Sequence, residues 1–249
     1  MSTEIIRWLP TLAATPAGPM RLFCLPHAGG GITAYLPWVA ALAPDAQVIP
    51  VLLPGRERRW QEPLLDDMEA LVAALVAVLA PEMDRPYALF GHSMGAWIAF
   101  ELARACRRLG LAAPQWLWAS GARAPDRPSR RPAIHTLPDP EFIAALRRYN
   151  GTPAEVLAEP ELLAMLLPML RVDFGLCERY RSRAEAPLSI PIIASGGLAD
   201  PEVSAEDVAA WRAHTDGPFR CHMMAGDHFY LHGDPPPIVA HLGRQLGRA

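Results

Sequence analysis

The chain has 249 residues, of which 51% are hydrophobic and 20% charged, so it is long and apolar enough to form a substantial core. This composition is not typical of a disordered protein. The formal net charge of -3 gives no electrostatic reason to expect nucleic-acid binding, which normally requires a basic face. No apolar face looks unpaired, so we expect a monomer.

Cysteine usage and hydropathy indicate the compartment. The four cysteines are far apart and include no C-x-x-C pair: Cys24, Cys106, Cys177 and Cys221. Neither a metal site nor a disulfide framework is predicted, and a reducing cytoplasm fits best. The N-terminus is no secretory signal, because Glu4 and Arg7 interrupt a short apolar stretch. The longest apolar run, residues 71–81, is too short to span a bilayer, so no membrane association is expected.

Short apolar runs alternate along the chain with longer amphipathic segments. The predicted strands are residues 21–25, 47–53, 87–90, 116–120, 190–195 and 219–224. The predicted helices between and after them are residues 33–43, 66–80, 95–109, 205–214 and 237–247. Strands that are almost continuously apolar, separated by helices, indicate an α/β fold with a mostly parallel sheet covered on both faces.

One segment, residues 123–187, interrupts this alternation because it contains no predicted strand. It opens with a proline- and arginine-rich stretch at residues 124–132, and two helices are predicted after it, at residues 140–149 and 160–183. A helical insertion between two strands is typical of a mobile lid, although a long helical crossover gives the same pattern. We expect a single domain, residues 1–249, with a lid insertion at about 123–187.

The sequence Phe90-Gly-His-Ser-Met-Gly95 matches the G-x-S-x-G pattern of a catalytic serine. The strand at 87–90 runs directly into it and an amphipathic helix leaves it. Gly91 and Gly95 permit a turn too tight for side chains, which would expose the Ser93 hydroxyl above a helix N-terminus. Ser93 is the candidate nucleophile; the alternative is an idle serine in an ordinary strand-to-helix turn.

Hydrolases with this motif order their catalytic residues as serine, acid and histidine, each on a loop after a strand. His228 follows the last predicted strand in Ala225-Gly-Asp-His-Phe229 and is the candidate base. Of the other histidines, His232 is the serious rival by position.

Asp200 is the candidate acid, because it follows the strand at 190–195 in Gly196-Gly-Leu-Ala-Asp200. It would orient the imidazole and stabilise the imidazolium. Asp227 is adjacent to His228 but more typical of a residue that shapes a loop, and Glu202 is a weaker alternative. Asp200 could instead, or also, cap the helix that follows.

A glycine-rich loop follows the first predicted strand, in Leu25-Pro-His-Ala-Gly-Gly-Gly31. Such a turn brings backbone amides close to a ligand. We assign the two donors of an oxyanion hole to the N–H groups of Ala28 and Met94. A phosphate-binding loop is not favoured, because neither G-x-x-x-x-G-K-[ST] nor G-x-G-x-x-G occurs.

Five segments together carry a family resemblance: Phe23–Gly30, Pro54–Arg58, Phe90–Gly95, Gly196–Asp200 and Gly226–Phe229. In order and spacing they resemble type II thioesterases, the editing hydrolases of nonribosomal peptide and polyketide assembly lines. The resemblance implies an α/β-hydrolase fold with a helical lid, no metal or cofactor, and a carrier-protein partner. The substrate would be an acyl thioester on the phosphopantetheine arm of an acyl or peptidyl carrier protein. No residue within the lid matches a family motif.

Two groups of side chains in the insertion have open roles. Arg123, Arg127, Arg130 and Arg131 could bind an acidic carrier surface or the pantetheine phosphate, or could simply belong to a solvated loop. An apolar stripe could line an acyl pocket or pack a helix: Met165, Leu166, Leu167, Met169 and Leu170.

Three other functions remain open. A generic esterase on small oxygen esters or acyl-CoA would use the same three residues without a carrier partner. A chain-terminating thioesterase usually ends a long multidomain chain, whereas this sequence starts at its own Met. A carrier-binding protein without activity would have no use for Ser93, Asp200 and His228 together.

Overall fold

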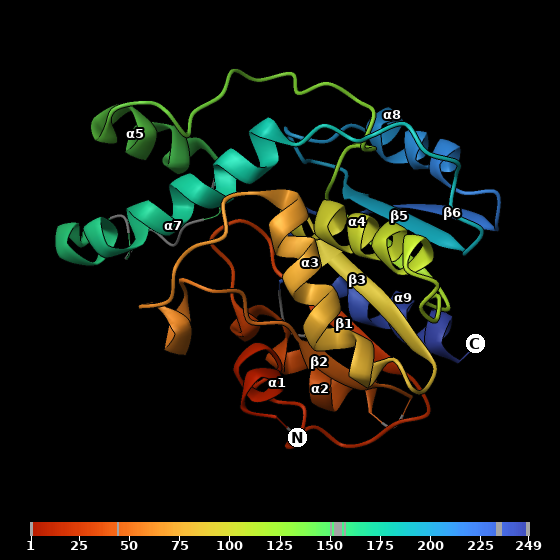
Figure 1. Cartoon of the computed structure of the whole chain (residues 1–249). Helices are drawn as coiled ribbons and strands as arrows, with labels where there is room; N and C mark the ends of the chain where they lie inside the picture. The colour runs from red at the N-terminus through yellow and green to blue at the C-terminus, as the bar shows by residue number, and fades with distance from the viewer. Residues whose placement is uncertain are drawn as a thin grey trace.

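The computed structural model describes residues 2–43, 45–149, 151, 156, 158–232 and 236–247. Its centre is a six-stranded sheet in the order β2-β1-β3-β4-β5-β6, and every pairing in that sheet is parallel (Figure 1). The strands are β1 (Arg21–Leu25), β2 (Gln47–Pro50), β3 (Tyr87–His92), β4 (Leu117–Ser120), β5 (Ile192–Gly197) and β6 (Phe219–Met224). The predicted parallel sheet is confirmed.

The predicted strand bounds are correct for β1 and β6, and differ elsewhere. Strand β2 ends at Pro50, three residues early, because the chain turns away from the sheet: the Leu52 N–H donates to the carbonyl of Trp8 at 2.8 Å. Residues 51–53 are nevertheless buried, which explains their apolar character. Strand β5 begins two residues late, after Pro191, which has no N–H for the ladder.

Helices cover both faces of the sheet. They are α1 (Thr3–Trp8), α2 (Leu36–Leu42), α3 (Met68–Leu79), α4 (Met94–Arg108), α8 (Ala205–Ala209) and α9 (Pro237–Leu246), with short 3-10 turns beside α2 and α8. Within β1, Phe23 and Leu25 belong to a core with residues of α1, α3, α4 and α8, whereas Leu22 and Cys24 belong to one with α2 and α9. Alternate side chains therefore enter opposite cores, as in a sheet buried on both sides. Helix α1 was not predicted.

The segment between β4 and β5 contains α5 (Asp139–Tyr149) and α7 (Pro160–Arg179), so both predicted helices are present, the second ending four residues early. In Figure 1 α5 lies at the upper left, and α7 runs from the left toward the centre, where its Leu176 joins the core that includes residues of α4. They share a small apolar core that includes Phe142, Leu146, Leu163 and Leu167. This separate core makes the pair a distinct layer over one end of the molecule.

The order of the strands locates a ligand site. From β1 the chain moves outward to β2, then returns to place β3 on the other side of β1 and adds β4, β5 and β6 beyond it. In open parallel sheets, ligands bind outside the carboxyl ends of the strands where the order reverses. Here that point lies between β1 and β3, which lead into the glycine-rich loop at 26–31 and into Ser93.

All four cysteines are free thiols. Among the described residues, no helix has the length and apolar character needed to cross a membrane.

Candidate active site

Ser93 lies at the junction of β3 and α4 with φ 53° and ψ -117°, a conformation that L side chains rarely adopt. Its N–H donates to the carbonyl of Ser120 at 2.7 Å. A Cβ at Gly91 would lie 2.0 Å from the carbonyl oxygen of Gly95, and a Cβ at Gly95 would lie 2.3 Å from that of Leu25. Both motif glycines are therefore required by close backbone approach, which brings the strained serine against the end of β1.

The same approach places two backbone amides near Ser93. Met94 is the first residue of α4, so its N–H has no partner within the helix. Ala28 is in the loop after β1 and lines the same cavity as Ser93. Within the part of the chain that the structure describes, neither amide donates to a protein acceptor. Both are free to bind a developing negative charge.

His228 and Asp200 come from the loops after β6 and β5. The Nδ1 of His228 is 2.7 Å from the Oδ2 of Asp200, and the Asp200 side chain is 0% exposed. The other carboxylate oxygen, Oδ1, accepts a hydrogen bond from the Glu202 N–H at 2.7 Å. With both oxygens bound, the carboxylate has one orientation, and it fixes that of the imidazole.

The alternative acids and the alternative base are engaged elsewhere. Asp227 Oδ1 accepts from the Phe229 N–H at 2.9 Å and so shapes its own loop, as expected. Glu202 pairs with Arg131 at 2.6 Å. His232 stacks on Phe229 with ring centroids 5.5 Å apart, and no carboxylate among the described residues binds it. Helix α8 is capped by Ser204 rather than by Asp200.

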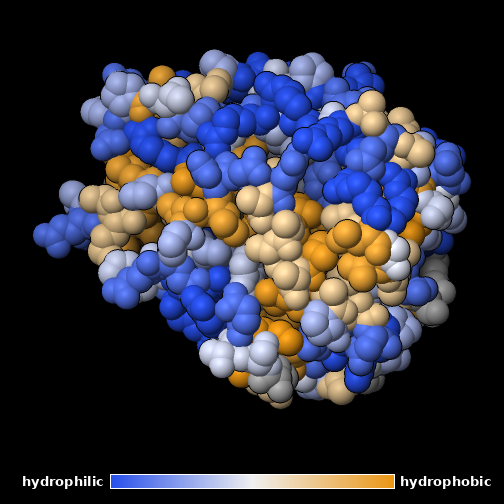
Figure 2. Space-filling view, in the orientation of Figure 1, coloured by the Kyte–Doolittle hydropathy of each residue, from blue (hydrophilic) through white to orange (hydrophobic). Residues whose placement is uncertain are grey.

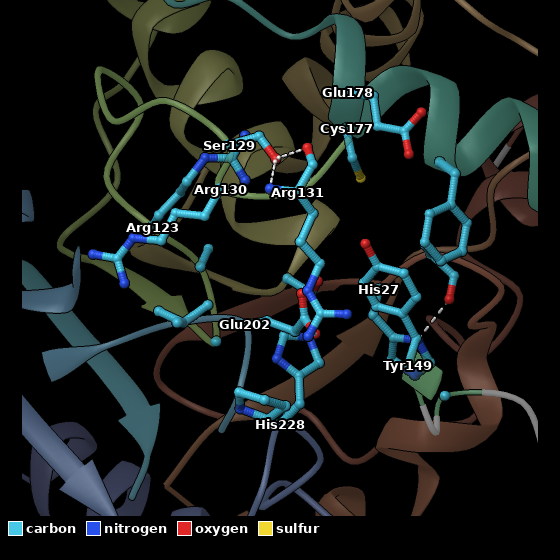
Figure 3. Close-up of a pocket in the computed structure, with 18 of the residues that line it drawn as sticks. His27, Arg123, Ser129, Arg130, Arg131, Tyr149, Cys177, Glu178, Glu202 and His228 are labelled. Carbon is cyan, nitrogen blue, oxygen red and sulfur yellow. Dashed lines mark hydrogen bonds and ion pairs between the residues drawn. The ribbon is translucent and has the colours of Figure 1, made fainter. Parts of the chain in front are cut away.

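One cavity brings most of these groups together. Ser93, Ala28 and His228 line it, and Figure 3 labels His228 among the lining side chains. Asp200 binds the Nδ1 of this imidazole. Among the described residues no hydrogen bond joins the Ser93 hydroxyl to His228; in unliganded sites such contacts are often long and tighten only with substrate. An arrangement of this kind can supply a nucleophile, an oriented base and two amide donors, which is what acyl transfer requires.

A hydrogen-bonded chain behind the cavity was not predicted. His92 Nδ1 is 2.9 Å from the Ser120 hydroxyl, which is 2.6 Å from the Tyr230 hydroxyl, and Tyr230 is 2.9 Å from the Ser195 hydroxyl. These residues join β3, β4, β5 and the loop of His228. The available signal was polar residues at the ends of otherwise apolar strands, Ser120 above all.

Two buried histidines flank the candidate base, and neither carries charge at neutral pH. Burial lowers the pKa of His27 to about 4 and that of His92 well below its usual value. We therefore expect both to stay uncharged at neutral pH.

This predicts a simple pH profile near neutral pH. Neither His27 nor His92 should add a step to it, so the acidic limb should reflect only the one general base that accepts the Ser93 proton. A plot of log kcat/KM against pH should have an acidic limb of slope one. A limb of slope two would show that His27 or His92 also titrates in this range, and would contradict the assignment.

The arginine-rich stretch lies at the cavity wall. Arg123, Arg130 and Arg131 line it, and Figure 3 shows the Arg131 side chain extending toward Glu202 and His228. Arg130 pairs with Asp207 at 3.3 Å, and Arg123 stacks over Trp97 at 4.5 Å. These arginines are therefore not merely a solvated loop.

The apolar stripe of α7 has a mixed role. Leu167, Met169 and Leu170 are buried in the core that α7 shares with α5, whereas Met165 is 64% exposed. Of the stripe, Leu170 also lines the cavity. The stripe is thus mainly a packed helix face.

As for metals, no three His, Cys, Asp or Glu side chains among the described residues are arranged to hold an ion.

Comparisons with known proteins agree with this geometry. The family model described as "Thioesterase domain" matches residues 20–246. Linear gramicidin dehydrogenase LgrE of Brevibacillus parabrevis is 43% identical over 237 residues, which are 94% of this chain and 90% of that protein.

Two solved structures are similarly close. The thioesterase RedJ of the prodiginine pathway in Streptomyces coelicolor is 40% identical, with a TM-score of 0.85 over 92% of this chain and 86% of that one. The type II thioesterase BorB from the borrelidin biosynthetic cluster is 42% identical, with a TM-score of 0.84 over 93% and 95%. The chain therefore belongs to the thioesterase family, and it is a thioester hydrolase with the α/β-hydrolase fold.

Proposed function

We propose that the chain is a type II thioesterase that releases aberrant or stalled acyl units from the phosphopantetheine arm of an acyl or peptidyl carrier protein. Ser93 is the nucleophile, His228 the base and Asp200 the residue that orients it. The observation that carries this is the 2.7 Å contact between His228 and Asp200 beside a cavity that Ser93 and the Ala28 amide also line. The carrier-bound substrate is supported by the similarity to RedJ, from the prodiginine biosynthetic pathway, and to BorB, a type II thioesterase from the borrelidin biosynthetic cluster.

In the first half of the reaction, His228 Nε2 takes the proton of the Ser93 hydroxyl as its oxygen attacks the thioester carbonyl. The resulting oxyanion accepts hydrogen bonds from the N–H groups of Ala28 and Met94. Collapse of the tetrahedral intermediate breaks the C–S bond. The thiol product, with a pKa of about 8.5, needs less help from an acid than an amine would.

In the second half, His228 removes a proton from water, which attacks the carbonyl of the acyl-serine. The same two amides bind the second oxyanion. The imidazolium then returns its proton to the Ser93 oxygen, and the carboxylic acid leaves. Asp200 stays ionised and stabilises the imidazolium in both halves.

The segment at about 123–187 is proposed to be a lid on this one domain. Support comes from its separate apolar core and from its side chains at the cavity wall, which include Tyr149 and Phe174 as well as Leu170. A layer of this kind can exclude water from the acyl-enzyme and admit the pantetheine arm.

The carrier protein is proposed to approach over the arginine-rich stretch. Figure 2 shows hydrophilic side chains along the upper edge of the molecule, where Figure 1 places the loop that follows β4. Arg130 is exposed at 62% of its side chain and lines the cavity. An acidic partner or a phosphate group would find charge-complementary side chains there.

We also propose that the protein acts as a monomer in the cytoplasm. Its large exposed apolar side chains are spread over several parts of the chain, as Leu36, Leu109 and Leu198 illustrate, and among the described residues only Leu162 and Met165 share a helix, α7. Free thiols, Cys221 among them at the surface, fit a reducing compartment.

A generic esterase acting on small oxygen esters or acyl-CoA is the second candidate, because the same three residues would serve it. The dehydrogenase activity in the name of the gramicidin relative belongs to that protein. This chain has no G-x-G-x-x-G motif for a dinucleotide.

The deciding experiment compares an acylated phosphopantetheinyl carrier protein with the matching acyl-pantetheine, at equal concentrations. Intact-mass measurements follow loss of the acyl group from each. We expect faster release from the carrier, because protein contacts add binding energy remote from the reacting carbonyl. Equal rates, or activity on oxygen esters alone, would leave a generic acyl hydrolase.

A further inference from the structure

The motif at residues 54–58 does not line the catalytic cavity, yet its charged side chains bind the loop that carries the Ala28 amide. Arg56 Nη1 donates to the carbonyl of Gly30 at 2.9 Å. Glu57 Oε1 accepts from the Ile32 N–H at 2.8 Å and from the Thr33 hydroxyl at 3.2 Å. Two adjacent residues thus bind both ends of the segment 30–33.

A third side chain reaches the same loop from α7. Asp173 Oδ1 is 2.8 Å from Arg56 Nη2, and its Oδ2 accepts the N–H of Gly29 at 2.8 Å. The Arg56 side chain is 5% exposed and that of Asp173 is 1% exposed. The Gly29 N–H and the Gly30 carbonyl, at the two ends of this pair of residues, are therefore both held by a buried ion pair through charge-assisted hydrogen bonds.

Helix α7 also packs directly on this loop. Gly29 has φ +73°, and a Cβ there would lie 2.7 Å from Cδ2 of Leu170, one turn before Asp173. The contact with α7 is therefore both apolar and ionic. This contact is made by Gly29, the residue next to Ala28. A shift of α7 would therefore also move the backbone at Ala28, whose N–H is the proposed donor.

Stability alone does not account for this pair. Desolvation of two charges offsets most of their attraction, and well-packed apolar residues in place of a buried ion pair are often as stable or more so. What the ion pair supplies and an apolar pair cannot is directional hydrogen bonding to two backbone groups of the loop. Orientation of an amide is what an oxyanion hole requires.

We propose that the ion pair of Arg56 and Asp173 positions the oxyanion-hole amide of Ala28 and couples it to the placement of α7. Both are positioning residues, because neither touches the reacting atoms. This rests on the proposed role of Ala28 in the reaction. It also gives the motif at 54–58 a function in catalysis.

The first test compares Asp173→Asn with Asp139→Asn on acyl-pantetheine. Asp139, at the start of α5, forms an ion pair with Arg171 of α7 at 2.6 Å, and among the described residues no hydrogen bond joins it to the oxyanion loop. We expect Asp173→Asn to lower kcat about 10- to 100-fold with KM within about twofold, short of the roughly 10²–10³-fold cost of losing a donor outright. Asp139→Asn should match the parent chain. An unchanged kcat in Asp173→Asn would overturn the proposal.

The second test separates the transition state from the ground state. An acyl-pantetheine analogue with a difluoromethylene ketone (–CO–CF2–) in place of the thioester forms a bond from the Ser93 oxygen to its carbonyl carbon, which gives a tetrahedral adduct with a negatively charged oxygen. The amide analogue stays planar. Asp173→Asn should weaken binding of the ketone at least tenfold and leave that of the amide unchanged. Equal losses for both ligands would indicate a general structural role and overturn the proposal.

The double variant Arg56→Met with Asp173→Leu covers the case in which a single variant leaves a charge buried and does not fold. It removes both charges together, so its melting temperature should return toward that of the parent. Its kcat should nevertheless stay low, because the loop has lost its hydrogen bonds. If both the melting temperature and kcat of the double variant returned to the parent's values, the ion pair would have only a structural role and the proposal would be wrong. If the proposed function itself were wrong, the parent chain would form no adduct between Ser93 and the ketone analogue.

Discussion

Replacement of Ser93 by alanine should lower kcat on an acyl carrier protein by at least about 10³-fold and leave the fold intact. The change removes the hydroxyl, the only group that can form the acyl-enzyme in the proposed mechanism. Alanine keeps the Cβ, so the strain at φ 53° is the same in both chains. The close contacts of Gly91 and Gly95 are also untouched.

The matched control is Ser204→Ala. Ser204 caps α8 through its side chain, so this variant should lose about 1 kcal/mol of stability without loss of rate. Intact-mass measurement of the carrier gives the rate, and thermal unfolding gives the stability. If Ser93→Ala kept more than a tenth of the parent's kcat, or if Ser204→Ala fell as far, the loss could not be assigned to a nucleophile.

The parallel sheet could be predicted because its signals are local. Apolar runs such as residues 21–25 and 219–224 coincide with β1 and β6, since a strand buried on both faces needs a continuous apolar run. The predicted strand at 47–53 was too long, because residues 51–53 are apolar and buried but are not part of β2. Helix α1 has only six residues, too few for a period to stand out.

The loops that carry the candidate site residues could be predicted from the sequence. Parallel strands share one carboxyl edge, so chain order alone placed Ser93, Asp200 and His228 on loops at the same edge of the sheet, after β3, β5 and β6. Their catalytic roles remain predictions, which the variants decide.

What lies around the site was not predictable. Arg56 and Asp173 are 117 positions apart, and Ser120 and Tyr230 are 110 apart. The helical and strand periodicities of a sequence are local, so they do not predict contacts between residues this far apart. A buried polar residue in an apolar environment signals that a partner exists, but the partner's identity depends on the tertiary packing.

The stripe on α7 illustrates a different limit. Leu167, which packs, and Leu170, which packs and also lines the cavity, have the same residue type and lie on the same helix face. Helical periodicity identifies the face that is covered, but it does not distinguish coverage by a second helix from coverage by substrate.

Replacement of Asp200 by asparagine should lower kcat by about 10⁴-fold, a loss that can be derived from its two hydrogen bonds. Oδ1 accepts from the Glu202 N–H and Oδ2 faces His228 Nδ1. Asparagine can satisfy the amide only with its oxygen, which turns its NH₂ toward the imidazole. Nδ1 must then accept, the proton moves to Nε2, and the base can no longer take a proton from Ser93.

Asp227→Asn is the matched control, one residue from the base. Its oxygen can still accept from the Phe229 N–H, so the loop should keep its shape and kcat should stay within about twofold of the parent's value. Single-turnover rates on acyl-pantetheine isolate the chemical step for both variants. A large loss in Asp227→Asn with little loss in Asp200→Asn would exchange the two assignments. Large losses in both would mean that the negative charge around His228, rather than the tautomer of its imidazole, limits the reaction.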